Sequence, residues 1–324
     1  MDMFDCKVAV SGFDIGPRLL VEEKKQPSVN WHDVLHYLKG SAILQGCKGH
    51  DLRLLATESY MSGGLRARLV KIFPSLAALR DDFAEATGRS VHLIKYNSLG
   101  IGGMEPDEQA ACFAIICLML GDLLAAEKQT GKVVWDIKNR TVKSSGFSTF
   151  SEGQEEAIFH TDTAFYKTPV RYFGLYCRQS AKCGGGVNRF CNAHALRRVV
   201  ENDENLSWIS NELARKPVEF RVPDAFTESE GVEVLSAKVF GEKIPVRLRR
   251  DSIAKGMGLS KSGNVNNALA AVDAFLELAL RPRNHIAMSL QEDGAVFVNN
   301  HEIIHSRSGF SDASRHLLRV WIKA

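Results

Sequence analysis

The part of the chain after about residue 131 is divided into many short β-rich runs, and this restricts the fold more than any other feature. Gly, Pro and Asp turns separate the runs. Short strands at such spacing favour a barrel or jelly roll over a sheet built from β-α-β units. The predicted strands are Lys132–Ile137, Arg171–Arg178, Val218–Val222, Val232–Phe240, Lys243–Arg249, Ile286–Leu290, Ala295–Asn299 and Leu317–Ile322.

Residues 1–130 are predicted to be mainly helical, with one short strand at Val91–Tyr96. The expected helices are Asn30–Leu38, Gly64–Thr87 and Pro106–Lys128. Two helical insertions, Ala193–Ala214 and Asn264–Leu280, interrupt the later strands, and the second has an apolar face that should pack on a sheet. We therefore predict a single α+β catalytic domain over residues 1–324, with a jelly-roll core over residues 131–324.

Composition excludes several classes of function. The 324 residues carry a net charge of +3 and are 45% hydrophobic and 24% charged, as in an ordinary globular protein. The densest basic run, Arg247-Leu248-Arg249-Arg250, is too short to indicate a nucleic-acid surface. The longest uncharged segment, Gln109–Gly121, is shorter than the roughly 20 residues of a membrane span. We expect a small-molecule partner and neither nucleic acid nor membrane, and the sequence does not indicate the oligomeric state.

The cysteines and the N-terminus point to a reduced, cytoplasmic protein. Seven cysteines are an odd number, they contain no CxxC pair, and several lie in apolar runs. The sequence begins Met1-Asp2-Met3-Phe4-Asp5 with no apolar stretch of signal-peptide length after it.

His160-Thr161-Asp162 is a candidate metal-binding pair, because residues two apart in an extended chain project to the same side. Alone it is weak evidence. With ten histidines and 38 acids, about one such His-x-acid pattern is expected by chance, and one is present. A satisfied His beside a solvated Asp is the simpler explanation of the tripeptide by itself.

His305 changes that weighing, because it lies between a strand-like run and a later run that carries arginines. Two imidazoles and one carboxylate leave open positions on an iron ion, as oxygen chemistry with a chelating cosubstrate requires. A closed zinc site would show four ligands, usually including cysteine. A zinc pair of His301 and His305 would need a helix, and the β-like sequence argues against one.

Arg315 and Arg319 are candidates for binding an anion beside the metal. Four residues apart in a strand, they share one face, with Leu318, Val320 and Ile322 on the other. A dicarboxylate that chelates the metal at one end would offer its other carboxylate to such a guanidinium. Structural salt bridges to nearby acids remain the alternative.

Four segments together resemble the iron(II)- and 2-oxoglutarate-dependent dioxygenases of the taurine dioxygenase and clavaminate synthase-like superfamily. They are Phe159–Phe165, Gly184-Gly185-Gly186-Val187, Asn299–Ser308 and Arg315–Ile322. The resemblance covers residue 131 to the C-terminus. It implies a double-stranded β-helix that uses Fe(II), 2-oxoglutarate and O2, with His160, Asp162 and His305 as iron ligands. It also implies that Arg315 holds the far carboxylate of 2-oxoglutarate, and that Arg319 assists it or faces the substrate.

Two departures from the family pattern concern the cosubstrate. The glycine turn usually ends in a Thr that helps to bind 2-oxoglutarate, whereas this chain has Val187, so Arg315 or a neighbour such as Asn188 would have to suffice. Relatives often read His-Gly-Arg where this chain has Ser306 after its histidine. Because Asp162 is present, the open coordination site of a halogenase is not expected.

Arg249 and Asp251 bear on the substrate. The segment Val246–Asp251 resembles a strand that offers two acids to cationic substrates in amino-acid hydroxylases of the group, but only Asp251 is an acid here. We therefore expect a neutral or carboxylate-bearing molecule, derived from an amino acid or peptide in natural-product biosynthesis, with Arg249, Asp251 and Arg319 as substrate-binding residues.

Two other functions compete with the oxygenase. A metal-dependent hydrolase could use a His-Asp-His site to activate water, and a jelly-roll protein could bind ligands without catalysis. A hydrolase does not need the arginine pair, and a non-catalytic binding protein would be expected to have lost one of the metal ligands. Two polar stretches, Ser144–Glu156 and Asp224–Gly231, are candidate substrate lids.

Overall fold

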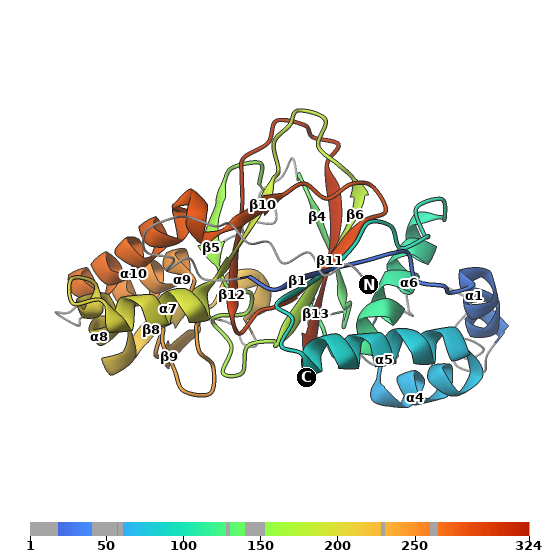
Figure 1. The fold of residues 1–324 in the computed structure, drawn as a ribbon, viewed down its shortest axis with the longest axis horizontal. Coiled ribbons are helices and arrows are strands. Elements are labelled where there is room, and N and C mark those ends of the chain that lie inside the picture. Colours follow the sequence, from blue (N-terminus) through green and yellow to red (C-terminus); the bar gives the residue numbers. More distant parts are fainter. Residues whose placement is uncertain are drawn as a thin grey trace.

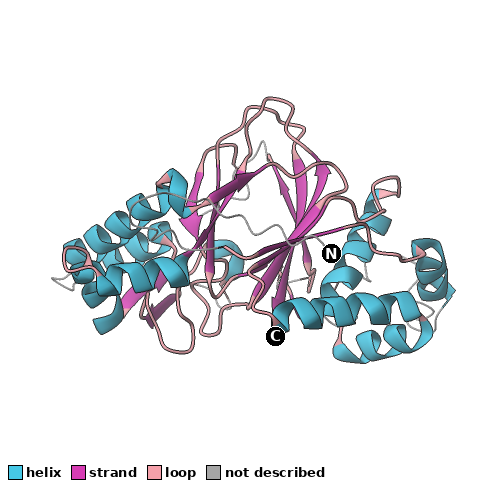
Figure 2. Ribbon diagram, viewed as in Figure 1, coloured by secondary structure: helices cyan, strands magenta, loops and turns pink. Residues whose placement is uncertain are grey.

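The computed structural model describes residues 19–40, 57, 61–127, 130–139, 153–227, 231–259 and 265–323. Two β-sheets lie at the centre, and one group of helices lies on each side (Figures 1 and 2). The helices are α1 (Trp31–Gly40), α4 (Gly63–Ile72), α5 (Pro74–Gly88), α6 (Pro106–Leu120), α7 (Ala193–Asn202), α8 (Ser207–Arg215), α9 (Arg250–Leu259) and α10 (Val265–Leu280), with 3-10 turns η2 (Asp224–Phe226) and η3 (Pro282–Asn284).

The larger sheet contains seven of the described strands in the order β1-β2-β11-β6-β13-β3, with β4 also paired to β13. Its only parallel pair is β1 with β2. The strands are β1 (Val21–Lys24), β2 (Leu93–Tyr96), β3 (Asp122–Leu124), β4 (Val134–Lys138), β6 (Tyr172–Gln179), β11 (Ala295–Asn299) and β13 (His316–Lys323).

The smaller sheet contains four described strands in the order β10-β7-β12-β5, all antiparallel. They are β5 (Ala157–His160), β7 (Asn188–Asn192), β10 (Ile286–Met288) and β12 (Ile303–Arg307). A separate hairpin pairs β8 (Val218–Arg221) with β9 (Val234–Ala237).

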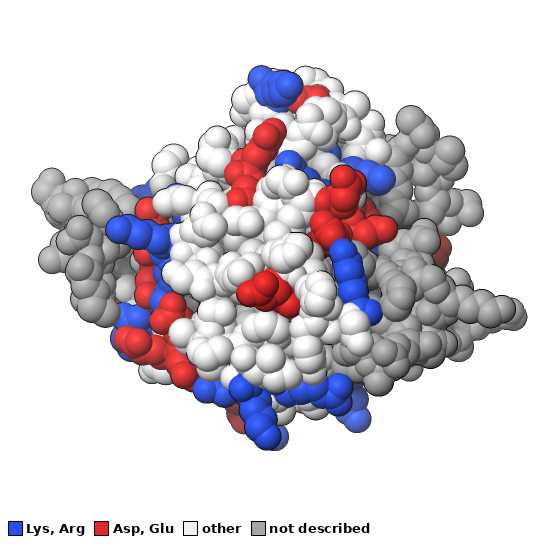
Figure 3. Space-filling model, turned by 90° about the vertical axis from the view of Figure 1, so that its right-hand side faces the viewer, with Lys and Arg blue, Asp and Glu red and all other residues white. Residues whose placement is uncertain are grey.

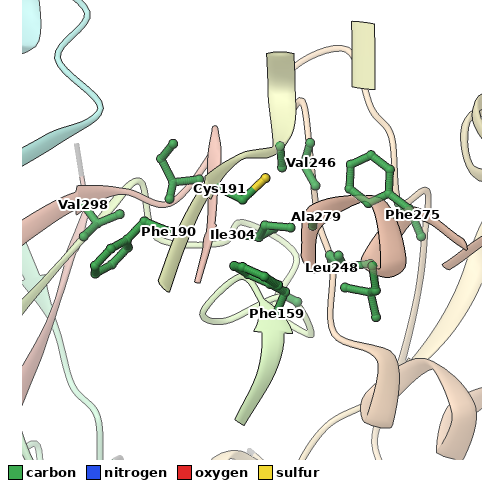
Figure 4. Close-up of a cluster of buried hydrophobic side chains, with 14 of the residues drawn as sticks. Phe159, Phe190, Cys191, Val246, Leu248, Phe275, Ala279, Val298 and Ile304 are labelled. Atoms are coloured by element: carbon green, nitrogen blue, oxygen red, sulfur yellow. The ribbon is translucent and has the colours of Figure 1, made fainter. Parts of the chain in front are cut away.

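One apolar cluster joins the two sheets to helices α7 to α10. Figure 4 shows Phe190 and Val298, from the smaller and larger sheets, on one side of the cluster, and Phe275 and Ala279 of α10 on the other. Ile304 of β12 belongs to the same cluster. The smaller sheet is thus covered on both faces, which explains why all five residues of β12 are buried.

A second cluster lies between the larger sheet and helices α1, α4, α5 and α6. Gly174 allows α6 to approach closely, because a Cβ there would lie 3.0 Å from Sγ of Cys117 and 3.1 Å from the ring of Phe113. Figure 3 shows this helical side of the molecule, where basic and acidic side chains lie mostly toward the edges of a largely uncharged surface, with an acidic side chain near its centre. On this face the basic residues do not form one continuous patch.

The structure confirms most of the predicted elements of the larger sheet, and it corrects several boundaries. The helix predicted over Gly64–Thr87 is two helices, because Pro74 has no amide hydrogen for an intrahelical bond and begins α5. The helix predicted over Pro106–Lys128 ends at Leu120. There the chain turns at Gly121, which packs so closely on β13 that a Cβ would lie 2.2 Å from the Lys323 carbonyl.

The strand predicted over Lys243–Arg249 is wrong. This segment contains no regular strand, because its polar backbone groups bond outside a ladder: the amide of Leu248 donates to Oγ1 of Thr161 at 3.0 Å. Helix α9, which was not predicted, begins at Arg250. The strands that were not predicted are β1, β3, β5, β7 and β12.

No helix in the described part of the chain is both long enough and apolar enough to cross a membrane. Five of the seven cysteines lie in that part, and all five are free thiols.

Candidate active site

The pairing of β5 with β12 places His160 directly opposite His305. The two imidazole rings lie 4.2 Å apart between centroids, and Phe173 of the larger sheet packs on His305 at 4.5 Å. Nδ1 of His160 donates to the carbonyl of Ile158 at 2.8 Å. This bond fixes the ring and leaves Nε2 to face the site, as in many histidines that bind a metal.

Asp162 completes the group. One atom from each of His160, Asp162 and His305 lies within 4.8 Å of the others, and all three residues are buried. Thr161 between them points away and bonds to Leu248, as expected for an extended chain. The structure therefore brings together the three residues that the sequence singled out.

Asp162 is held by residues far away in the sequence. Trp321 donates from Nε1 to Oδ2 at 2.8 Å, and Arg319 donates from Nη1 to Oδ1 at 3.2 Å. The side chain of Asn300 accepts from the amide of Asp162 at 2.8 Å and donates to the carbonyls of Asp162 and Val170. Asn300 thereby fixes the turn that follows β5.

The electrostatics keep all three residues in the protonation state that binds metals. Burial opposes the charge of Asp162, but the positive charge of Arg319 and the hydrogen bond from Trp321 hold its pKa down at about 2. Burial also lowers the pKa of His160, against the attraction of Asp162, and lowers that of His305 well below its usual value. A neutral pair of imidazoles beside an ionised carboxylate is the result.

These residues fit a divalent cation. Nδ1 of His305 is buried and has no hydrogen-bond partner among the described residues, which is costly unless something binds there. Two neutral imidazoles and one carboxylate, with no cysteine, are a donor set suited to iron(II).

Arg315 lies just before β13, next to the glycine turn. Its side chain is 3% exposed, packs over the ring of Phe310 at 5.0 Å, and has no partner for Nη1 among the described residues. Gly186 has a φ of +71°, and a Cβ there would lie 2.6 Å from Nε of Arg315. The glycine turn thus leaves room for a guanidinium to which no described residue offers a carboxylate.

Arg319 has a different environment. It lies within β13 and lines the same pocket as Arg315, and its charge is neutralised by Asp162. Leu318, Val320 and Ile322 point into the cluster on the other face, as predicted. The structure therefore distinguishes the two arginines by their acidic partner: Arg319 orients a candidate metal ligand, whereas the described residues offer Arg315 no carboxylate. Each keeps one buried donor without a partner among the described residues, Nε of Arg319 and Nη1 of Arg315.

Arg249 and Asp251 also reach the site. The guanidinium of Arg249 donates to both carboxylate oxygens of Asp251, at 3.1 and 3.2 Å, and lies over the ring of Phe165 at 5.6 Å. Arg249 is 4% exposed. They lie at the start of α9 rather than in the strand that the sequence predicted.

Two of the candidate metal ligands and the arginines line one pocket. Its lining is formed by Ile137, Ala157, His160, Leu175, Asn188, Phe226, Arg249, His305, Ser306, Arg307, Arg315, Leu317 and Arg319. Asn188, the proposed substitute for the missing Thr, is therefore in the lining, whereas Val187 is not. Arg307 shares the Phe310 ring with Arg315, at 4.7 Å, and donates to the carbonyls of Gly153 and Glu155.

Other candidates lie elsewhere. His301 is in a turn, its Nε2 is 3.1 Å from the carbonyl of Pro169, and it does not form a pair with His305. It lines a separate groove of about 1010 Å³ beside β9, which contains none of the three candidate ligands. Of the two predicted lids, residues 144–152 and 228–230 lie outside the described part of the chain.

Sequence reasoning missed Asn300, Trp321 and Arg307. Asn300 stood within a quoted motif without a role, and Trp321 lies two residues after Arg319, on the same face of the strand. The two-residue spacing from Arg319 could have predicted that Trp321 points toward the site. Arg307 lies two residues after His305 and so shares its face of β12.

Comparison with known proteins identifies the family. The model of the "Taurine catabolism dioxygenase TauD, TfdA family" matches residues 74–321, more than half of the chain. The chain belongs to this dioxygenase family. The match agrees with the resemblance drawn from the sequence and extends it to the helical N-terminal part.

A search of curated proteins finds FR-33289 synthase of Streptomyces rubellomurinus (strain ATCC 31215). It is 41% identical over 59 residues, which are 16% of this chain and 17% of that protein. The chain therefore matches less than a fifth of the length of this relative.

Solved structures of non-haem iron oxygenases resemble the whole fold. Asparagine oxygenase, solved with Fe(II), 2S,3S-3-hydroxyasparagine and succinate, has a TM-score of 0.62 and 17% identity over 93% of each chain. OrfP, solved with Fe and alpha-ketoglutaric acid, has a TM-score of 0.57 and 15% identity over 94% of each chain.

Proposed function

We propose that this protein is an iron(II)- and 2-oxoglutarate-dependent oxygenase that hydroxylates, or otherwise oxidises, a small amino-acid- or peptide-derived molecule in natural-product biosynthesis. One observation carries the proposal: two neutral imidazoles and an ionised carboxylate converge beside a buried arginine that has a spare donor. The ligands named in the structures of asparagine oxygenase and OrfP support the same cofactors.

Each residue has a defined role in this proposal. His160, Asp162 and His305 hold iron(II), and Arg319 and Trp321 orient Asp162. Arg315 binds the far carboxylate of 2-oxoglutarate, and Asn188 supplies a further polar contact. We further infer that the two sheets form the double-stranded β-helix of a single domain, and that the protein works in the reducing cytoplasm.

When bound, iron and 2-oxoglutarate supply the oxidising chemistry by consuming O2 and releasing succinate and CO2. The protein binds and orients the reactants and excludes water. Ile137, Leu175 and Leu317 give the pocket an apolar wall beside the two imidazoles, so a substrate C–H bond can be held there without competing solvent.

The two alternatives have no specific support. A hydrolase does not need a second buried guanidinium beside its metal, and a binding protein does not need the three candidate ligands. Membership of a dioxygenase family favours catalysis with oxygen.

Anaerobic addition of Fe(II) and 2-oxoglutarate tests the proposal. The wild type should develop the weak visible metal-to-ligand charge-transfer band, and His160→Ala should not. His301→Ala is the matched control, because it removes a half-buried histidine outside the triad and should keep the band. A wild type without the band, or an undiminished band in His160→Ala, would refute the proposal.

A further inference from the structure

The active-site pocket is strongly and asymmetrically charged. Four of its lining residues are arginines, and no Asp or Glu is among the lining residues. Two carboxylates stand just behind the lining: Asp162 pairs with Arg319, and Asp251 pairs with Arg249. Positive charge therefore exceeds negative charge among the described groups around the pocket, and a bound iron(II) ion would widen the difference by two.

The proposed cosubstrate removes only part of this excess. 2-Oxoglutarate brings two negative charges, which equal those of the iron ion alone. The sum of the described charges then stays positive by two, and the four guanidiniums belong to buried residues, where surplus charge is costly. A neutral or cationic substrate would leave that cost unrelieved.

The four arginines form two groups around different aromatic rings. Arg315 and Arg307 share Phe310, next to the glycine turn. Arg249 lies over Phe165 and Arg319 over Trp321, and both rings contact Phe226. The group at Phe310 is the proposed site for the far end of 2-oxoglutarate, which leaves the group at Phe226 to the substrate.

Within the second group, Arg249 is the residue suited to recognition. Arg319 orients Asp162, a candidate iron ligand, so a shift of its side chain toward a substrate would disturb the metal site. Arg249 is instead oriented by Asp251, which is not a candidate ligand and engages its Nε and Nη2. The guanidinium of Arg249 is thus oriented before a ligand binds, which reduces the conformational entropy lost on binding.

We infer that Arg249 recognises an oxyanion on the substrate, such as a carboxylate, and that this group places the substrate between Phe226 and the metal. This inference rests on the proposed function and narrows its substrate class. An arginine in this segment selects a negatively charged group on the substrate. The two acids that amino-acid hydroxylases of the group carry there would select a positively charged one. A cation that carries no oxyanion is accordingly excluded as a substrate, because its charge would face Arg249.

Direct binding to the anaerobic complex with Fe(II) and saturating 2-oxoglutarate tests the inference without turnover. Isothermal titration calorimetry would follow four probes: N-acetylglycine, N-acetylaminomethylphosphonate, the neutral N-acetylglycinamide and the cation agmatine. We expect heat from at least one of the two oxyanions, and which one binds more tightly identifies the substrate group. The charge-transfer band should persist, showing that the probe has not displaced 2-oxoglutarate.

Arg249→Gln should weaken the oxyanion at least about tenfold, since charge-assisted hydrogen bonds are lost, while the band still forms with 2-oxoglutarate. Arg250→Gln is the matched control: Arg250 pairs with Asp273 outside the pocket, and its loss should leave probe binding unchanged. Arg249→Lys, which keeps the charge without the fork, should be intermediate.

Equal binding of oxyanions to wild type and Arg249→Gln would overturn the inference. So would binding of the neutral amide or agmatine as tight as that of the oxyanions, or no binding of either oxyanion. If Arg249→Gln does not fold, the comparison of the four probes on the wild type decides alone. A wild type that forms no band with 2-oxoglutarate would refute the proposed function itself.

Discussion

Arg315 and Arg319 differ in what surrounds their guanidinium groups. Both are buried, Arg315 just before β13 and Arg319 within it, but Arg319 is paired with Asp162, whereas Nη1 of Arg315 has no partner in the described part of the chain. A charged donor left unpaired in the interior requires an anion. In the proposed enzyme that anion is the far carboxylate of 2-oxoglutarate.

Arg315→Gln should therefore raise the concentration of 2-oxoglutarate required for the charge-transfer band by roughly thirty-fold or more. Removing one partner of a buried charged hydrogen bond costs about 2–5 kcal/mol, and 1.4 kcal/mol is a factor of ten. Arg319→Gln should instead weaken iron binding, because Asp162 loses its cationic partner. Titrations of each component at saturation of the other separate the two effects. A larger change in the 2-oxoglutarate requirement for Arg319→Gln would exchange the roles.

Part of this arrangement could be predicted residue by residue. His160, Asp162 and His305 are identifiable because residue type, spacing and strand context agree. Asn300 and Trp321 were not predicted, since their contacts with Asp162 span 138 and 159 positions and depend on how the two sheets face each other. The division of labour between Arg315 and Arg319 likewise depends on which of them reaches Asp162.

At the scale of elements, the turn of residues 184–186 shapes the cosubstrate site. Gly184 and Gly186 have almost the same φ, +75° and +71°, in the left-handed region that favours glycine. They differ in surroundings. A Cβ at Gly186 would meet Arg315, while a Cβ at Gly184 would meet nothing within 4 Å.

This difference allows a matched prediction. Gly186→Ala and Gly184→Ala carry a similar backbone cost, about 1 kcal/mol or more, but only Gly186→Ala displaces the Arg315 side chain. We expect Gly186→Ala to raise the 2-oxoglutarate requirement and Gly184→Ala to change only the thermal stability. Calorimetric titration of 2-oxoglutarate and thermal unfolding measure the two quantities. Equal 2-oxoglutarate requirements in both variants would contradict this role of Gly186.

The elements that carry the site were also the hardest to predict. β5 (Ala-Ile-Phe-His) and β12 (Ile-Ile-His-Ser-Arg) do not alternate between apolar and polar residues. All five residues of β12 are buried, so its sequence lacks the pattern of a strand with one exposed face. The apolar strands β6, β11 and β13 were predicted within one or two residues, because burial against two cores leaves them continuously hydrophobic.

At the scale of the whole molecule, the larger sheet belongs to both apolar clusters. Leu317 and Trp321 of β13 face the site-side cluster, and Leu318, Val320 and Ile322 face the cluster that packs on the N-terminal helices. The N-terminal helices cannot leave without exposing one face of this sheet, and the smaller sheet with α7 to α10 cannot leave without exposing the other. The proposal of a single domain follows from this shared sheet.

We therefore expect the iron-free protein to unfold in one cooperative transition. Urea unfolding followed by far-ultraviolet circular dichroism and by tryptophan fluorescence should give coincident midpoints, because the buried Trp31 and Trp321 report on opposite clusters. Two separated transitions would contradict the single domain.

The most direct test of the central claim is anomalous scattering at the iron edge, from crystals grown anaerobically with Fe(II) and 2-oxoglutarate. We expect one iron peak bonded to His160, Asp162 and His305, with 2-oxoglutarate extending from it to the guanidinium of Arg315. An iron peak elsewhere, or a cosubstrate that does not reach Arg315, would contradict the account.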